Sequence, residues 1–158
     1  MTTSKIILGI NAFHADSSAC IIIDGKLIAA IEEERLNRIK HYAGFPLEAI
    51  KECLTISGIK DKDITDIAFN TKPLSNLIPK GIHFVRNLSL GENFAKKRFL
   101  KKSNMHKIIN EKLDLDKKVK FHFIEHHLAH IASAYYPSEF KKANSLSIDG
   151  FGDFVSFA

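Results

Sequence analysis

The chain has 158 residues, of which 45% are hydrophobic and 26% are charged, a composition typical of a globular domain with a sizeable core. No apolar run approaches the length of a membrane-spanning helix, and the apolar start of the chain is too short for a secretion signal. We therefore expect a cytoplasmic protein in which Cys20 and Cys53 are reduced, buried thiols.

The net charge of +5 is concentrated in one segment, because residues 96–118 hold nine Lys or Arg residues against three acidic residues. Such a segment could contact a nucleic acid or a polyphosphate. The charges follow helical spacing, so we interpret them as the solvated face of a helix and do not expect a nucleic-acid partner.

The first part of the chain predicts an antiparallel start to a sheet. Apolar, β-branched strands are expected at 5–10, 19–23 and 26–33. Asp24 and Gly25 join the second strand to the third, and glycine tolerates the positive φ that a tight hairpin turn requires.

Helices and strands then alternate. Pro46 suits the first position of a helix, and Gly58 suits the position just after its end. The further elements expected are a strand at 66–71, an insertion at about 73–118 that is mostly helical from 92 to 113, a strand at 119–124, a helix at 125–136, and strands at 146–149 and 154–157.

This order predicts an α/β fold with a mixed sheet that opens with three antiparallel strands and carries helices on its faces. The sequence ends in a strand pattern directly after a glycine-rich turn. A strand without a partner is an unusual end for a domain, so we expect a fragment of a longer protein.

Two histidines are the strongest candidate metal ligands. His126 and His130 are four residues apart, which on a helix places both imidazoles on one face and within reach of one ion. Asp149, at the end of the next strand, is the natural third ligand. His127 lies off that face, so it has a supporting or substrate-binding role at most. The alternative is a histidine pair that only packs beneath the sheet.

Three other stretches could bind anions or move protons. His14 follows the first strand, where a histidine can act as a general base, although it could be an ordinary turn residue. The glycines of Asp149-Gly150-Phe151-Gly152-Asp153 could admit a phosphate or simply form a hairpin. The stretch after the third strand is rich in cationic side chains: Arg35, Arg38, Lys40 and His41. These side chains could bind a phosphate or a carboxylate, or they could simply form a charged surface.

Three segments together resemble the N-terminal part of the O-carbamoyltransferases, which carbamoylate hydroxyls of nodulation factors and of antibiotics such as tobramycin and cephamycins. They are GINAFHADSSACIIIDGKLIAAIEEERLNRIKHYAGFP, EHHLAHIASAYYPS and SIDGFGD. The resemblance implies the actin-like ATPase fold, related to ribonuclease H, with residues 1–143 as the first subdomain and 144–158 as the opening hairpin of the second. The segment at about 73–118 carries no motif of that family.

The resemblance also implies a reaction. Such enzymes use ATP and carbamoyl phosphate to make a carbamoyl-adenylate, and then transfer the carbamoyl group to a hydroxyl of a small molecule or glycan. The implied metal is Fe²⁺, with Mn²⁺, Zn²⁺ and Mg²⁺ as alternatives. A fragment of this length is expected to be inactive alone, and a homodimer is left open.

By the same resemblance, each candidate residue receives a role. The implied metal ligands are His126, His130 and Asp149, and the implied base for the acceptor hydroxyl is His14. Gly150, Gly152 and Asp153 match the turn that faces the nucleotide phosphates. The basic stretch, with His127 as a further candidate, would bind carbamoyl phosphate or the acceptor.

Two other functions stay open at this point. A relative of the enzymes that threonylcarbamoylate tRNA would use the basic segment at 96–118 to contact RNA. A nucleotide-binding domain without catalytic activity would bind ATP but not turn it over.

Overall fold

A computed structural model describes residues 4–72, 104–152 and 155–157 of the chain. The chain divides into two compact units. The first comprises Met1–Phe69 and Leu100–His122, and the second comprises Asn70–Phe99 and Phe123–Ala158. The expected subdomain boundary between residues 143 and 144 stays a prediction.

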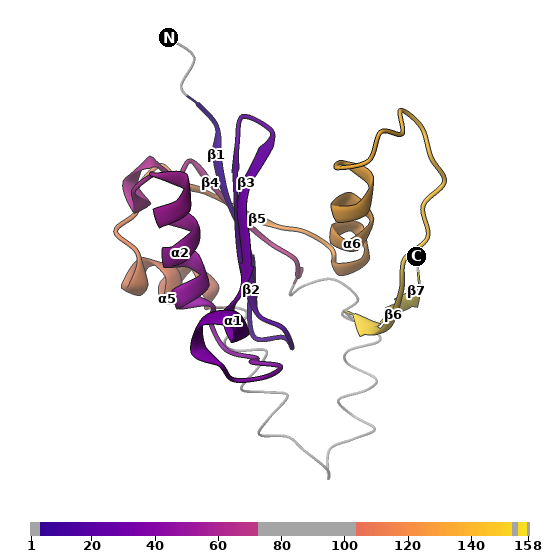
Figure 1. Ribbon diagram of the computed structural model, residues 1–158, viewed down its shortest axis with the longest axis horizontal. Coiled ribbons are helices and arrows are strands. Elements are labelled where there is room, and N and C mark those ends of the chain that lie inside the picture. Colours follow the sequence, from indigo (N-terminus) through magenta and orange to yellow (C-terminus); the bar gives the residue numbers. More distant parts are fainter. Residues whose placement is uncertain (1–3, 73–103, 153–154, 158) are drawn as a thin grey trace. The chain divides into compact units, whose positions relative to one another are not determined.

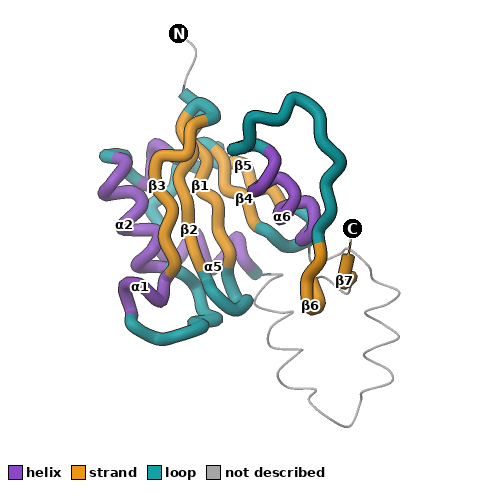
Figure 2. Tube along the Cα trace, turned by 45° about the vertical axis from the view of Figure 1, so that its right-hand side comes forward, coloured by secondary structure: helices purple, strands orange, loops and turns teal. Residues whose placement is uncertain are grey.

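The first unit is built on a five-stranded sheet in the order β3-β2-β1-β4-β5 (Figure 2). Its strands are β1 Ile6–Asn11, β2 Ser18–Ile23, β3 Lys26–Glu32, β4 Asp66–Phe69 and β5 Lys120–Phe123. β1 pairs antiparallel with β2, and β2 pairs antiparallel with β3. β4 pairs with the other edge of β1 in parallel. The mixed sheet and the antiparallel start expected from the sequence are therefore confirmed, whereas the actin-like ATPase half-domain remains a prediction.

The hairpin between β2 and β3 turns at the predicted pair. Asp24 and Gly25 have φ values of 49° and 83°, so both lie in the left-handed region that a two-residue hairpin turn requires. The Asp24 carboxylate also accepts a hydrogen bond from the backbone N–H of Lys5 at 2.7 Å. The turn is thus fixed to the start of β1 as well as to its own strands.

Three helices of the first unit lie on one side of this sheet (Figure 1). They are α1 Glu33–Asn37, α2 Leu47–Ser57 and α5 Met105–Lys112. α2 ends at Gly58, which is left-handed with φ 67°, as the sequence predicted. The five-residue helix α1 was not expected, because the sequence indicated a strand running to residue 33 and then a loop.

The core lies between the sheet and α2 and α5. Leu8 and Ile21 from the sheet, Ile50 from α2 and Ile109 from α5 are fully buried. Burial of one such side chain contributes about 1.5–3 kcal/mol, so this layer carries much of the stability of the unit. Cys53 of α2 belongs to it, while Cys20 on β2 is only half-buried, and both are free thiols.

A buried carboxylate joins α1 to α2. Glu33 is 4% exposed, and its Oε2 accepts the backbone N–H of Ala49 at 2.8 Å while Oε1 accepts that of Glu48 at 3.4 Å. Those N–H groups belong to the first turn of α2, where backbone N–H groups have no hydrogen-bond acceptor within their own helix. Pro46 precedes the helix and provides no side-chain cap. Glu33, a residue of α1, therefore caps the N-terminus of α2 and ties together the two ends of the loop between these helices.

A short 3-10 turn, η1 Asp61–Asp63, precedes β4. Asp61 accepts the backbone N–H of Asp114 at 3.2 Å, and Lys62 forms an ion pair with the Asp114 carboxylate at 3.0 Å. These contacts attach the end of α5 to the turn before β4. Only part of the helix expected at 92–113 falls in the described residues, where α5 confirms it; residues 73–103 lie outside them.

The second unit contains α6 His126–Tyr135 and a two-stranded sheet of β6 Ile148–Gly152 and β7 Val155–Phe157. α6 matches the predicted helix within a residue at each end. The glycines do not form the predicted turn, because Asp149, Gly150 and Gly152 lie within β6, and Gly152 pairs with Val155 of β7. Glycine weakens the interior of a strand but is found there at bulges, and the β6–β7 pairing has a register shift between Ile148 and Gly152, so glycine alone did not distinguish a turn from a strand. No helix in the described part of the chain is long and apolar enough to cross a membrane.

Candidate metal centre

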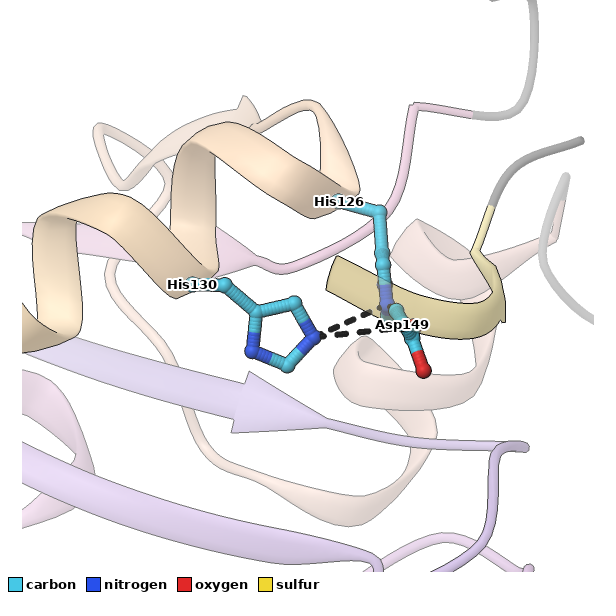
Figure 3. A group of neighbouring side chains, drawn as sticks. All are labelled: His126, His130 and Asp149. Carbon is cyan, nitrogen blue, oxygen red and sulfur yellow. Dashed lines mark hydrogen bonds and ion pairs between the residues drawn. The ribbon is translucent and has the colours of Figure 1, made fainter. Parts of the chain in front are cut away.

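Three side chains of the second unit converge as the sequence predicted. His126 and His130 project from one face of α6 toward Asp149 on β6 (Figure 3). The Nε2 of His126 lies 2.6 Å from Oδ2 of Asp149 and 3.0 Å from Nε2 of His130. The Nε2 of His130 lies 3.8 Å from Oδ2 of Asp149. The spacing of four residues and the returning strand thus place three ligand atoms around one point.

The geometry of this triangle fits a bound cation. Ligand atoms about 2.0–2.2 Å from one metal lie roughly 3.0–3.4 Å from each other in tetrahedral or octahedral coordination. The distances here, 2.6, 3.0 and 3.8 Å, bracket that range. A single imidazole nitrogen has either one proton or one lone pair, so His126 Nε2 can form only one ordinary hydrogen bond with its two neighbours. A shared cation satisfies all three atoms at once.

The site is open on one side. His126 is buried, whereas the His130 side chain is 53% exposed and that of Asp149 is 31% exposed. Three protein ligands with access from solvent are typical of a catalytic metal, which keeps a position for water or substrate. The nitrogen and oxygen donors suit Fe²⁺, Mn²⁺ or Zn²⁺ better than Mg²⁺, which prefers oxygen ligands.

The start of α6 is fixed by Glu125. Its carboxylate accepts the backbone N–H of Leu128 at 2.8 Å, which caps the first turn of the helix. A negative charge at a helix N-terminus also interacts favourably with the helix dipole. Since His126 is the first residue of the helix, this cap stabilises the turn that carries the first candidate ligand.

His127 lies apart from the three converging atoms. It is fully buried, and its Nδ1 is 2.8 Å from Oγ of Ser147. Ser147 is itself buried and directly precedes β6. The arrangement suits a supporting role, in which His127 holds the strand that carries Asp149 against the helix.

Two of the three residues expected to face a phosphate fall within the described part of the chain. Gly150 and Gly152 lie in β6, and Asp153 is outside the described residues. Their role in binding a nucleotide stays a prediction.

His14 lies in the first unit, in the segment between β1 and β2, and is half-buried. That segment is tied to the loop after α1 by two backbone hydrogen bonds, from Phe13 N–H to the Gly44 carbonyl and from Ser17 N–H to the Tyr42 carbonyl, each 3.0 Å. The buried Ser17 hydroxyl lies 2.8 Å from the Gly44 carbonyl. His14 is therefore carried on a braced loop rather than on a free turn.

The basic stretch separates into two groups. Arg35, Arg38 and Lys40 line a cavity of about 300 Å³ together with Glu34. His41 instead directs Nδ1 to Oδ1 of Asp16 at 2.9 Å. The structure thus brings three of the four predicted cationic residues together.

The model of the family described as "Carbamoyltransferase N-terminus" matches residues 6–157. The chain belongs to this family. The three motifs that suggested O-carbamoyltransferases in the sequence are all within the matched range.

Relatives of this carbamoyltransferase N-terminal chain occur in distant organisms. An uncharacterized protein of Synechocystis sp. is 37% identical, over 95% of this chain and 26% of its own length. Nodulation protein NolNO of Sinorhizobium fredii is 34% identical, over 92% of this chain and 21% of its own length. An uncharacterized protein of Methanocaldococcus jannaschii is 31% identical, over 96% of this chain and 23% of its own length. The chain spans about a quarter of the length of these relatives.

Several residues with structural contacts in this carbamoyltransferase N-terminal chain were not identified from the sequence. Glu125 was predicted as the first residue of the helix rather than as its N-cap, and the preference of helix N-caps for oxygen acceptors was the available signal. Ser147, Glu33 and the Asp16–His41 pair left no such signal. Each contact joins residues at least 16 positions apart in the chain, and so depends on the fold.

Proposed function

We propose that the protein to which this chain belongs transfers a carbamoyl group from carbamoyl phosphate to a hydroxyl of a small molecule or glycan, with ATP consumed and a carbamoyl-adenylate formed on the way. Membership of the carbamoyltransferase N-terminus family and the relation to a nodulation protein support this proposal. The observation that carries it is the convergence of His126, His130 and Asp149 on one point.

His126, His130 and Asp149 would hold the metal, for which Fe²⁺ is the first candidate. A cation bound there would supply Lewis-acid stabilisation of negative charge on oxygen in the reacting group. The chain's own contribution is to keep the three ligand atoms in place. The Glu125 cap fixes the start of α6, and the His127–Ser147 contact holds the strand that follows.

His14 is the proposed base. In the transfer step, the acceptor oxygen forms a bond to the carbamoyl carbon, and the bond from that carbon to the AMP phosphate oxygen breaks. The hydroxyl proton passes to the His14 imidazole, which must be neutral to accept it. A positioned base of this kind contributes roughly 10²–10⁴-fold to the rate. The braced loop that carries His14 suits this role because it limits the movement of the ring.

Anionic substrates need cationic partners. Arg35, Arg38 and Lys40 line one cavity, and we assign to them the phosphate of carbamoyl phosphate, which an Arg fork can bind through two parallel hydrogen bonds. The backbone N–H groups near Gly150 and Gly152 are the proposed contacts of the ATP phosphates.

The direct test uses the full-length protein. Purified with its metal, it should release pyrophosphate from ATP only when carbamoyl phosphate is present, and His126→Ala or His130→Ala should remove both the metal and this activity. His106→Ala is the matched control, since His106 is an exposed histidine on α5. A protein that retains its full metal content after both ligand substitutions, or that never releases pyrophosphate, contradicts the proposal.

A further inference from the structure

The loop between β1 and β2, which carries His14, is attached to a distant segment on both sides of that residue. The backbone N–H of Phe13 donates to the Gly44 carbonyl at 3.0 Å, and that of Ser17 donates to the Tyr42 carbonyl at 3.0 Å. The proposed base therefore lies between two points of attachment to the segment that follows the basic stretch.

Ser17 is the residue on which these contacts converge. It is 1% exposed, and its hydroxyl lies 2.8 Å from the Gly44 carbonyl oxygen and 3.2 Å from the carbonyl oxygen of His14 itself. The Ser17 carbonyl accepts the backbone N–H of Glu33, the first residue of α1, at 2.9 Å. One buried serine thus contacts the loop of the base, the segment after the basic stretch and the helix that carries Arg35.

The hydroxyl is the part of this network that a side-chain substitution removes. The contacts of Ser17 with Tyr42 and Glu33 use backbone groups, so an alanine at position 17 can still form them. The contacts with the carbonyls of His14 and Gly44 use the hydroxyl alone. A hydroxyl has one proton to donate, so its loss leaves one of these two carbonyl oxygens with one donor fewer.

Phe13 gives a second, independent sign that the loop is held in a fixed conformation. Its φ is 57°, a left-handed value that is an outlier for a bulky side chain. The Phe13 ring is buried and packs against the ring of Phe45, with the centroids 6.5 Å apart. Such conformations persist only where the surroundings enforce them, and they concentrate at functional sites. Here the enforced conformation lies at the residue directly before His14.

We propose that Ser17 is a positioning residue of the transfer reaction, whose hydroxyl fixes His14 relative to the basic stretch. This inference rests on the proposed function, in which His14 accepts the proton of the attacking hydroxyl and the basic stretch binds carbamoyl phosphate. A small displacement of a base slows proton transfer strongly. Long cationic side chains can follow a phosphate through a displacement of the same size. Loss of the Ser17 hydroxyl should therefore slow the step that uses His14 and spare the step that does not.

The two half-reactions of the full-length protein separate these steps. Formation of the carbamoyl-adenylate releases pyrophosphate and needs no base at the acceptor. Water then takes the place of the acceptor: its oxygen bonds to the carbamoyl carbon, the bond from that carbon to the AMP phosphate oxygen breaks, and a water proton passes to His14. In a single turnover, Ser17→Ala should keep the rate of pyrophosphate release, and its release of AMP should slow on the order of tenfold or more. His14→Ala should show the same separation with a larger loss.

Ser57→Ala is the matched control. The Ser57 hydroxyl on α2 donates to the Cys53 carbonyl at 2.7 Å, a part-buried contact outside the β1–β2 loop. This variant should change neither half-reaction, and urea unfolding checks that all variants are folded. Ser17→Cys is the second test variant, because a thiol has nearly the size of the hydroxyl and is a weaker donor. It should recover part of the AMP release that Ser17→Ala loses.

The inference is overturned if Ser17→Ala releases AMP as fast as the unmodified protein, if both half-reactions slow equally, or if Ser57→Ala shows the same loss. It also fails if His14→Ala leaves AMP release unchanged, since Ser17 acts through His14. An unmodified protein that releases no pyrophosphate rejects the proposed function itself, and this inference with it.

Discussion

His127 and Ser147 are both buried and meet at 2.8 Å, through Nδ1 of the imidazole and Oγ of the hydroxyl. The contact joins α6 to the residue that directly precedes β6. Asp149 follows two residues later and reaches His126 at 2.6 Å. The helix residue between the two metal-ligand candidates thus anchors the strand that supplies the third.

Ser147→Ala should therefore weaken both folding and metal binding. Removing one partner of a buried hydrogen bond lowers the free energy of unfolding by about 1–3 kcal/mol. Metal affinity should fall on the order of tenfold, because Asp149 is then less well positioned. Urea unfolding and metal titration measure the two effects. Ser133→Ala, on an exposed position of α6, should change neither, and equal effects of both substitutions would show that Ser147 has no positioning role.

Glu125→Ala tests the cap of α6. The loss of the hydrogen bond to the Leu128 N–H should lower the free energy of unfolding by about 1 kcal/mol, with a smaller decrease in metal affinity because His126 is the first helical residue. The exposed Glu139 lies after the helix, so Glu139→Ala should have little effect on denaturant unfolding. An unchanged unfolding midpoint for Glu125→Ala would mean that the cap does not stabilise α6.

Asp66 and His122 make stability depend on pH. Burial tends to raise the pKa of the Asp66 carboxyl, but hydrogen bonds from His122 at 2.6 Å and Thr65 at 2.8 Å outweigh it and hold the pKa below its usual value. A carboxyl whose pKa is lower in the folded state contributes stability above its unfolded pKa. That contribution is lost as the pH falls through the folded pKa, below about pH 4.

His122→Ala should lower the free energy of unfolding at pH 7 by about 1–3 kcal/mol. It should also flatten the decrease in stability below about pH 4, because the pKa of Asp66 is then no longer held down. Urea unfolding between pH 7 and pH 3 measures both effects. Lys62→Ala removes an exposed ion pair with Asp114, which solvent screens, and should leave the free energy of unfolding nearly unchanged. A parallel pH dependence of His122→Ala and the unmodified chain would contradict the role of His122.

The two thiols should react slowly in the folded chain. Burial raises the pKa of Cys53 to about 11 and raises that of Cys20 as well. Since the thiolate is the reactive form, labelling by a disulfide reagent at pH 8 should be slow for both residues and rapid after unfolding in urea. Cys20 is half-buried and should react before Cys53. Immediate labelling of Cys53 in the folded chain would show that α2 does not bury this residue against the sheet.

Features encoded by neighbouring residues were predictable from the sequence. Asp24-Gly25 gave the hairpin, and the apolar β-branched runs gave β1 to β3. The spacing of His126 and His130 predicted that the two imidazoles share one face of a helix, as they do on α6. These signals act within a few residues, where backbone preference and helical periodicity decide the structure.

Other features depend on contacts between distant segments. α1 is five residues long, too short to show a periodic pattern, and it forms where Glu33 can reach α2. Gly150 and Gly152 lie in a strand because β7 pairs with β6, whereas glycine alone is equally suited to a turn. His41 was grouped with the neighbouring arginines, but its partner Asp16 is 25 residues away in the chain.

Glu33 offers the clearest test of such a distant contact. Glu33→Ala should lower the free energy of unfolding by about 2 kcal/mol or more, since it leaves the first N–H groups of α2 without this acceptor and opens a cavity at a buried position. Glu33→Gln should recover part of that loss, because the amide oxygen can accept the Ala49 N–H while its NH₂ group needs a new partner. Thermal and urea unfolding measure the relative stabilities of the unmodified chain and the two variants. Glu48→Ala, at an exposed residue of the same helix turn that pairs with Lys51, serves as the control. If the Ala and Gln variants at position 33 are equally stable, the carboxylate does not cap α2 and the buried charge has another role.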